Sequence, residues 1–170
     1  MKRPDSLIFD MDNLDSLEIV WNKGLEAMGY EQIVTRDSLL GLMGKEARGL
    51  LNAIVPEVSI EEQDKLFDEV LRVYEAYHPY IKPRIFEGVN EGLEVLSTKY
   101  RLFMLSNCEK GGLVNFMNHT KTSHLFEDYM EHGQNLKPKA FNLQLLKERN
   151  NLENPVYVGD TDSDGKETRK

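Results

Sequence analysis

The sequence has 170 residues, a formal net charge of −8 and a single cysteine, Cys108. A chain of this length can bury one sizeable hydrophobic core and carry a small inserted domain. The acidic balance and the lack of a basic stripe with interleaved aromatic residues argue against nucleic acids and anionic membranes as partners. One cysteine rules out an internal disulfide framework, and no apolar run is long enough for a signal peptide or a membrane span. We therefore expect a cytoplasmic globular protein.

The first expected element is a buried strand, Leu7-Ile8-Phe9, which stops at Asp10 and Asp12. A continuous apolar run this short is typical of a central strand in a parallel sheet. Ligands of open α/β sheets bind beyond the carboxyl ends of the strands, so both carboxylates are expected at a site. Taken alone, the two acids could equally be ordinary turn or capping residues.

The next stretch, up to about Tyr77, shows the period of amphipathic helices and no convincing strand. Asp15 and Glu18 have the spacing of a capping box, which places the start of the first helix near Asp15. Further helices are expected over residues 37–42, 47–54 and 59–77. Two prolines between residues 78 and 83 mark a hinge or crossover. The pattern predicts an all-helical domain over residues 15–83, inserted into a core formed by residues 1–14 and 84–170.

Beyond the hinge, helical and strand patterns alternate along the chain. Strands are expected over residues 101–105 and 155–158, and helices over residues 88–97, around 113–117 and from Pro138. A short segment near Tyr129 has no clear assignment. Alternating strands and helices imply right-handed crossovers, so the predicted fold class is α/β with a parallel sheet.

Polar residues follow three of the predicted strands, and in a parallel sheet these strand ends meet at one edge. They are Asp10 and Asp12, Ser106 and Asn107, and the run from Asp160 to Asp164. Carboxylates supply the hard oxygen ligands that suit Mg²⁺, here Asp10, Asp12 and Asp160. Hydroxyl, amide and ammonium groups suit phosphate oxygens, here Ser106, Asn107 and Lys137. Each group alone could be a turn, a cap or solvated surface, but their coincidence at matching strand ends favours a site.

Four segments resemble the motifs of the haloacid dehalogenase superfamily, and the match is closest to its phosphoglycolate-phosphatase-like branch. They are Phe9-Asp10-Met11-Asp12-Asn13, Leu105-Ser106-Asn107, Lys137-Pro138 and Val158-Gly159-Asp160-Thr161-Asp162-Ser163-Asp164. The resemblance implies a Rossmann-like core, with the first strand at its centre, and a helical cap. It implies Asp10 as a nucleophile that forms an aspartyl-phosphate, and Asp12 as general acid and base. Ser106 and Lys137 would hold the phosphoryl group, and Asp160, supported by Asp164, would hold Mg²⁺.

The chain departs from this family pattern in two places. The segment Asp12-Asn13-Leu14-Asp15-Ser16 is shorter than in the family by about two residues, which tightens the turn that leads into the cap. The sequence ends at Lys170, where the family continues with at least one more strand and helix. The strand over residues 156–158 is therefore expected to be an uncovered edge.

Two basic residues of the helical block, Lys45 and Arg48, could reach toward an anionic substrate, although solvated helix charges are the more common explanation. The sequence as a whole is interpreted as a Mg²⁺-dependent phosphatase of a small phosphorylated metabolite, acting as a monomer or a weak homodimer. Two alternatives stay open. One is a phosphomutase on the same core, and the other is a catalytically weak or inactive binding or regulatory protein, which the two departures make credible.

Overall fold

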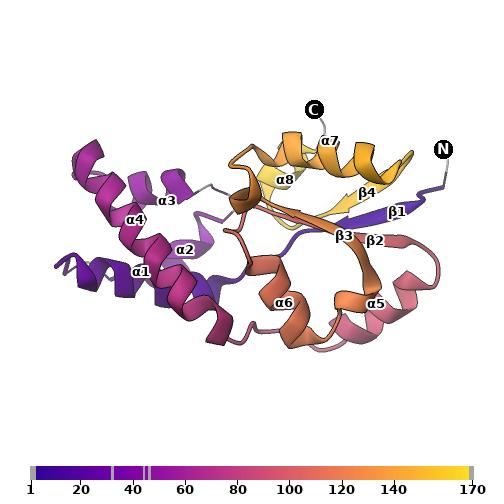
Figure 1. Ribbon diagram of the computed structural model, residues 1–170, viewed down its shortest axis with the longest axis horizontal. Coiled ribbons are helices and arrows are strands. Elements are labelled where there is room, and N and C mark those ends of the chain that lie inside the picture. The colour runs from indigo at the N-terminus through magenta and orange to yellow at the C-terminus, as the bar shows by residue number, and fades with distance from the viewer. Residues whose placement is uncertain (1–2, 32, 44, 46, 169–170) are drawn as a thin grey trace. The chain divides into compact units, whose positions relative to one another are not determined.

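The computed structural model describes residues 3–31, 33–43, 45 and 47–168. The chain folds into two compact units (Figure 1). One comprises the residues up to Asp12 together with those from Ile85 onward, and the other is Asn13–Arg84. These limits lie close to the boundaries expected at residues 14 and 84.

A parallel sheet of four strands forms the centre of the first unit. The strands are β1 (Ser6–Phe9), β2 (Arg101–Ser106), β3 (Phe126–Glu131) and β4 (Pro155–Val158). Their order is β3-β2-β1-β4, and every neighbouring pair is parallel. Strand β1 therefore lies inside the sheet, and the Asp10 amide extends its pairing by donating to the carbonyl of Val158 at 2.9 Å. The predicted α/β fold class with a parallel sheet is confirmed.

Helices cover both faces of this sheet. They are α5 (Val89–Ser97), α6 (Gly112–Thr120), α7 (Lys139–Asn150) and α8 (Asp162–Glu167), with the short 3₁₀ turns η2 (Ser123–Leu125) and η3 (His132–Gln134). Figure 1 shows α7 and α8 on one face and α5 and α6 on the other. Side chains alternate along a strand, so Phe103 and Leu105 of β2 pack with Leu146 of α7. Leu102 and Met104 pack in the clusters that contain residues of α5 and α6.

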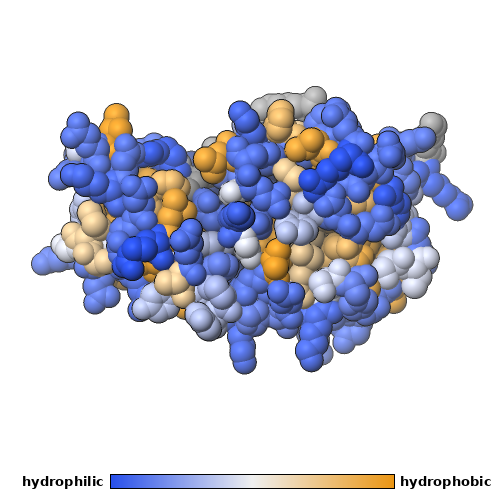
Figure 2. Space-filling model, viewed as in Figure 1, coloured by the Kyte–Doolittle hydropathy of each residue, from blue (hydrophilic) through white to orange (hydrophobic). Residues whose placement is uncertain are grey.

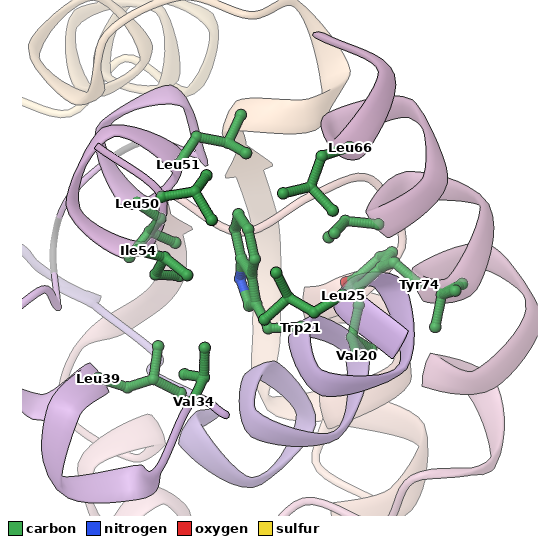
Figure 3. Close-up of a cluster of buried hydrophobic side chains, with 13 residues drawn as sticks. Val20, Trp21, Leu25, Val34, Leu39, Leu50, Leu51, Ile54, Leu66 and Tyr74 are labelled. Atoms are coloured by element: carbon green, nitrogen blue, oxygen red, sulfur yellow. The ribbon is translucent and has the colours of Figure 1, made fainter. Parts of the chain in front are cut away.

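The second unit is built from α1 (Leu14–Ala27), α2 (Arg36–Leu40), α3 (Ala47–Ile54), α4 (Ile60–Tyr77) and the 3₁₀ turn η1 (His78–Tyr80). Its described residues contain no strand, as the sequence predicted. Trp21 of α1 is 2% exposed and anchors the core. Figure 3 shows its indole between Leu51 of α3 and Leu66 of α4. Helices α1 and α4 approach closely at Gly24, where an added Cβ would lie 2.5 Å from a methyl carbon of Val70.

The helix starts in this unit agree with the sequence prediction in one case and differ in another. Ser59 caps α4, accepting from the amide of Glu62 at 3.3 Å, so this helix starts where the predicted range 59–77 places it. Helix α1 begins at Leu14, and Asn13 caps it by accepting from the Ser16 amide at 3.2 Å. The predicted capping role of Asp15 is wrong, because Asn13 already supplies the side-chain oxygen that N-terminal amides need.

Two elements of the sheet unit lay outside the sequence prediction. Strand β3 covers the segment near Tyr129, and α8 begins at Asp162, within the acidic run. β3 pairs with β2 alone, and its sequence, FEDYME, mixes acids with aromatic residues. An edge strand with polar residues lacks the apolar run by which buried strands are found.

No described helix combines the length and the apolar character needed to cross a bilayer. On the face drawn in Figure 2, hydrophilic side chains dominate and apolar ones are scattered. Strand β4 is an edge of the sheet among the described residues, with Val156 43% and Val158 41% exposed.

Candidate active site

A buried ion-pair cluster lies at the carboxyl edge of the sheet. The ammonium of Lys139 donates to Asp10 Oδ2 at 2.6 Å and to Asp164 Oδ1 at 2.6 Å. The Asp10 side chain is 6% exposed, that of Asp164 4% and that of Lys139 2%. Asp10 follows β1, Asp164 lies in the first turn of α8, and Lys139 is the first residue of α7. Three segments distant in sequence therefore meet at the predicted strand edge.

The lysine of this cluster is Lys139 and not Lys137, to which the sequence analysis assigned the contact with the phosphoryl group. Lys137 is exposed and precedes the helix, and its carbonyl accepts from the Asn142 side chain at 3.2 Å. Pro138 is the N-cap of α7, so the helix starts at Lys139. The side chain of that first helical residue reaches the strand edge. A cation at a helix N-terminus opposes the helix dipole, so the two carboxylates are the groups that hold it there.

Asp164 orients the lysine and also takes part in capping the start of α8. Its Oδ2 accepts from the Thr161 amide at 3.0 Å and from the Thr161 hydroxyl at 2.7 Å, which completes a capping box. Gly159 makes room for this carboxylate, since a Cβ there would lie 2.6 Å from Asp164 Oδ2. Both oxygens of Asp164 thus have partners in Lys139 and Thr161, and the expected support of Asp160 by Asp164 is not seen among these contacts.

The three charges of the cluster shift one another's pKa values. Burial raises the pKa of Asp10 above its ordinary value, while the ammonium of Lys139 opposes that rise. Burial alone would also raise the pKa of Asp164, but the hydrogen bonds from Lys139 and Thr161 lower it to about 2. Burial would lower the pKa of Lys139, yet the two carboxylates raise it. Lys139 therefore carries its charge at neutral pH.

Asp12 differs from the buried acids because much of its surface is exposed. Desolvation by the surrounding protein, followed by the negative charges of Asp10 and Asp160, raises the pKa of Asp12 to about 7. A carboxyl group with a pKa near neutrality can give up a proton and take one back, which suits general acid and base work.

Ser106 is the last residue of β2, and Asn107 follows it. The Ser106 hydroxyl is buried, donates to the carbonyl of Met11 at 2.9 Å and accepts from the Cys108 amide at 3.2 Å. Met11 lies between the two acids of the first motif, so this bond joins the end of β2 to the turn after β1. The predicted meeting of these strand ends is therefore seen in the structure.

The acids at this edge are also the candidates for binding a metal ion. Among the described residues, no three acidic, histidine or cysteine side chains are grouped so as to hold an ion. The predicted set of Asp10, Asp12 and Asp160 is thus not assembled as three carboxylate ligands, since the Asp10 carboxylate turns toward Lys139. Mg²⁺ is commonly bound through one or two carboxylates, with waters and substrate phosphate completing its shell. Asp10 and Asp160 follow the adjacent strands β1 and β4 and fit that smaller donor set.

The two basic residues proposed as cap contacts lie in the helical unit. Arg48 forms an ion pair with Asp64 at 2.5 Å, and its guanidinium lies 5.8 Å from the centre of the Phe67 ring. Both partners of the pair are about half exposed. Lys45 is exposed. The contacts of Arg48 within its own unit favour the explanation as a solvated surface charge.

Sequence reasoning missed two further residues around the cluster. Tyr157 of β4 donates its hydroxyl to the carbonyl of Leu105 at 3.1 Å, and its ring centre lies 5.6 Å from the Lys139 ammonium. Glu131, at the end of β3, is buried and binds the start of α6. A polar residue at the end of each strand is the signal that could have found Glu131, had β3 been recognised.

The fold and this edge together define a class: a parallel α/β protein with a carboxylate–ammonium site beyond its central strand. The family model described as haloacid dehalogenase-like hydrolase matches residues 7–170. The chain belongs to this family. A comparison with curated protein sequences gave no match.

Solved structures share this fold across nearly the whole chain. A haloacid dehalogenase-like family hydrolase from Streptococcus pneumoniae is 18% identical with a TM-score of 0.83, over 98% of this chain and 80% of that one. A protein from Haemophilus somnus, named a predicted phosphoglycolate phosphatase, is 21% identical with a TM-score of 0.79, over 96% and 80%. A predicted phosphatase from Clostridium acetobutylicum is 14% identical with a TM-score of 0.83, over 99% and 81%. At sequence identities this low, the structural similarity establishes the fold alone.

Proposed function

We propose that this protein is a Mg²⁺-dependent phosphatase that hydrolyses a small phosphomonoester through an aspartyl-phosphate on Asp10. One observation carries the proposal. Asp10 ends the central strand of a haloacid dehalogenase-like hydrolase and is held by a buried lysine that a second carboxylate fixes. Structural relatives named as phosphatases support the phosphoglycolate-phosphatase-like branch.

In the first step, a carboxylate oxygen of Asp10 attacks the phosphorus atom. A bond forms between them as the bond from phosphorus to the leaving oxygen breaks. Asp12 protonates that leaving alkoxide, for which its pKa of about 7 is suited. In the second step, Asp12 takes a proton from water as the water oxygen attacks phosphorus. Inorganic phosphate leaves, and the Asp10 carboxylate is restored.

Lys139 reduces the electrostatic repulsion between the attacking carboxylate and the phosphate. A carboxylate that approaches a phosphate dianion meets like charge, and negative charge spreads over the phosphoryl oxygens in the transition state. A preorganised cation in a site shielded from water stabilises that charge strongly. Asp164 fixes the position of the Lys139 ammonium through the 2.6 Å hydrogen bond. Asn107, the residue after β2, is proposed to supply an amide donor for the phosphoryl oxygens, while the Ser106 hydroxyl donates to the carbonyl of Met11 and holds the turn next to Asp10.

Mg²⁺ is proposed as the second source of positive charge. Asp10 and Asp160 would hold it, and when bound it would polarise the phosphoryl group and neutralise its charge. The four aspartates at this edge, Asp10, Asp12, Asp160 and Asp164, face the single buried cation Lys139 in the described structure, which leaves an excess of negative charge for a divalent ion to balance.

The test is phosphate release from p-nitrophenyl phosphate by the purified chain. We expect turnover with added Mg²⁺, its loss in EDTA and its return when Mg²⁺ is restored. Asp10→Asn, purified in the same way, is the control for contaminating phosphatases. Absence of Mg²⁺-dependent release from both this substrate and a panel of phosphorylated metabolites would contradict the proposal and favour a non-catalytic role.

A further inference from the structure

A buried glutamate at the end of β3 binds the loop that follows β2. Glu131 is 1% exposed. Its Oε1 accepts from the Gly111 amide at 2.6 Å, and its Oε2 accepts from the Leu113 amide at 3.0 Å. The Cys108 thiol also points to Oε2 at 3.8 Å. One carboxylate thus contacts residues at both ends of the segment between Ser106 and helix α6.

Two residues further on, Gly133 holds the same loop from its backbone. The Gly133 amide donates to the carbonyl of Cys108 at 3.1 Å. A Cβ at Gly133 would overlap the backbone nitrogen of Lys110 and lie 2.7 Å from the carbonyl carbon of Glu109. These neighbours are backbone atoms and cannot swing aside like a side chain. Only glycine fits at position 133 while the loop keeps this path.

A simple helix cap does not account for this arrangement. Helices are usually capped by a serine, threonine, aspartate or asparagine at their own N-cap position. Helix α6 has Gly111 there, with φ of 93° and no side-chain cap. The acceptor comes instead from another strand and is a charged group whose burial costs free energy unless it is well paired. A local neutral cap would satisfy the helix at lower cost, so the glutamate serves the placement of the loop.

The loop in question adjoins the reacting group. Ser106 begins it and is bonded to the carbonyl of Met11, the residue after Asp10. At the other end, the amides of Gly111 and Leu113 donate to Glu131, and that of Gly112 donates to the Glu109 carbonyl at 3.1 Å. The first amides of α6 are therefore already occupied. These three amides are therefore not available to an anion at this edge, which leaves the loop to bind it.

We propose that Glu131 and Gly133 are positioning residues that hold the loop from Ser106 to Gly111 in the form that binds the phosphoryl group. The inference rests on the proposed function for the identity of the anion. It predicts that disturbing either residue weakens the binding of phosphate, although neither residue touches it.

The test uses two variants and a matched control. Glu131→Gln keeps the shape but replaces one acceptor oxygen with a donor, so one of the two amides loses its partner. Gly133→Ala pushes on the loop from the other side. Asp128→Asn, on the same strand, is the control because Asp128 accepts from Arg149 at 2.5 Å and from Asn150 at 2.6 Å, outside the loop. Thermal unfolding establishes that each variant is folded at the assay temperature.

Two readouts are compared: the Kd of inorganic phosphate by calorimetry and the KM for p-nitrophenyl phosphate. Loss of binding that is equal in ground and transition states raises KM and leaves kcat unchanged. We expect Kd and KM to rise at least about threefold in Glu131→Gln and Gly133→Ala relative to Asp128→Asn, with kcat nearly constant. A smaller rise in Kd in both loop variants would overturn the inference. If Glu131→Gln does not fold, Gly133→Ala decides.

The phosphate titration separates this inference from the proposed function, because it needs no turnover. If the wild-type protein binds phosphate but hydrolyses nothing, the proposed phosphatase activity is contradicted. The Kd values alone then test the positioning role of Glu131 and Gly133. A wild-type protein that does not bind phosphate overturns the inference.

Discussion

The two units of this protein bury different kinds of side chain. Among described residues of the helical unit, the buried polar side chains are Ser16 and Gln63, and no charged group is buried. Its ion pair between Arg48 and Asp64 is about half exposed. The sheet unit buries the charges of Glu131, Lys139 and Asp164 close to its strand ends.

This difference shows where the fold departs from what stability alone favours. Buried ion pairs are often no more stable than hydrophobic residues of similar volume, because the loss of hydration offsets the attraction. The core around Trp21 is built from hydrophobic side chains. The strand edge keeps three buried charges at a place where parallel sheets bind ligands, which points to chemistry and not to packing.

The largest effect is expected from the nucleophile. Asp10→Asn removes the attacking carboxylate but keeps the size of the side chain, so turnover should fall by more than about 10⁴-fold. Asp64→Asn removes a carboxylate of the helical unit and should leave kcat/KM unchanged. Steady-state kinetics with p-nitrophenyl phosphate measure both. Substantial turnover by Asp10→Asn, once contamination is excluded, would refute the covalent mechanism.

The next largest effect is expected from Lys139, in contrast to its neighbour Lys137. Lys139→Met leaves two buried carboxylates without their cation, which should cost about 3–5 kcal/mol of stability and about 10²–10³-fold in kcat. Lys137→Met changes an exposed residue, and both quantities should stay close to wild type. Urea unfolding and steady-state kinetics measure the two effects. Equal losses in both variants would contradict the assignment of Lys139.

A smaller effect is expected in the core of the helical unit. Gly24→Ala places a Cβ 2.5 Å from a methyl carbon of Val70 and should cost about 1–3 kcal/mol by overpacking. Gly92→Ala, in α5 of the sheet unit, meets no atom within 4 Å. That change should stabilise its helix by about 0.5–1 kcal/mol. If thermal unfolding shows Gly24→Ala to be neutral, the close approach of α1 and α4 is wrong.

The last effect concerns the pH dependence of stability through Asp12. In the unfolded chain this carboxyl ionises near its ordinary pKa of 3.8, whereas in the folded protein its pKa is about 7. The folded state therefore binds more protons between these values, and the free energy of unfolding falls as pH rises from about 4 to about 7. Asp12→Asn lacks this loss. In EDTA, its stability relative to wild type should grow over that interval and level off above it. A difference that does not change with pH would contradict the raised pKa.

Much of this architecture follows from local sequence patterns. The run Leu7-Ile8-Phe9 before Asp10 identifies a buried central strand because only a doubly covered strand is apolar at successive positions. The helices around Trp21 follow from apolar spacing at the helical period. The edge where Asp10 and Ser106 meet follows from the rule that parallel strands end on the same side.

The remaining details depend on contacts between distant segments. Lys137 and Lys139 are two residues apart, and the sequence pattern does not reveal which of the two is the first residue of the helix. The path of the preceding turn decides this, and it includes Leu136 with φ of 56°, a conformation that sequence patterns do not reveal for leucine. Glu131 was missed because β3 was not recognised as a strand, and because the amides that it binds lie 18 and 20 residues earlier in the chain.

The central claim is that Asp10 carries the phosphoryl group during turnover, and one measurement tests it directly. Asp12→Asn lacks the base for the second step, but p-nitrophenolate leaves without a proton, so the first step should still proceed. Acid quenching of this variant with p-nitrophenyl phosphate and Mg²⁺, followed by mass spectrometry, should find one phosphoryl group on the peptide that contains Asp10. A burst of nitrophenol with no such modified peptide, or a phosphoryl group on another residue, would contradict the account.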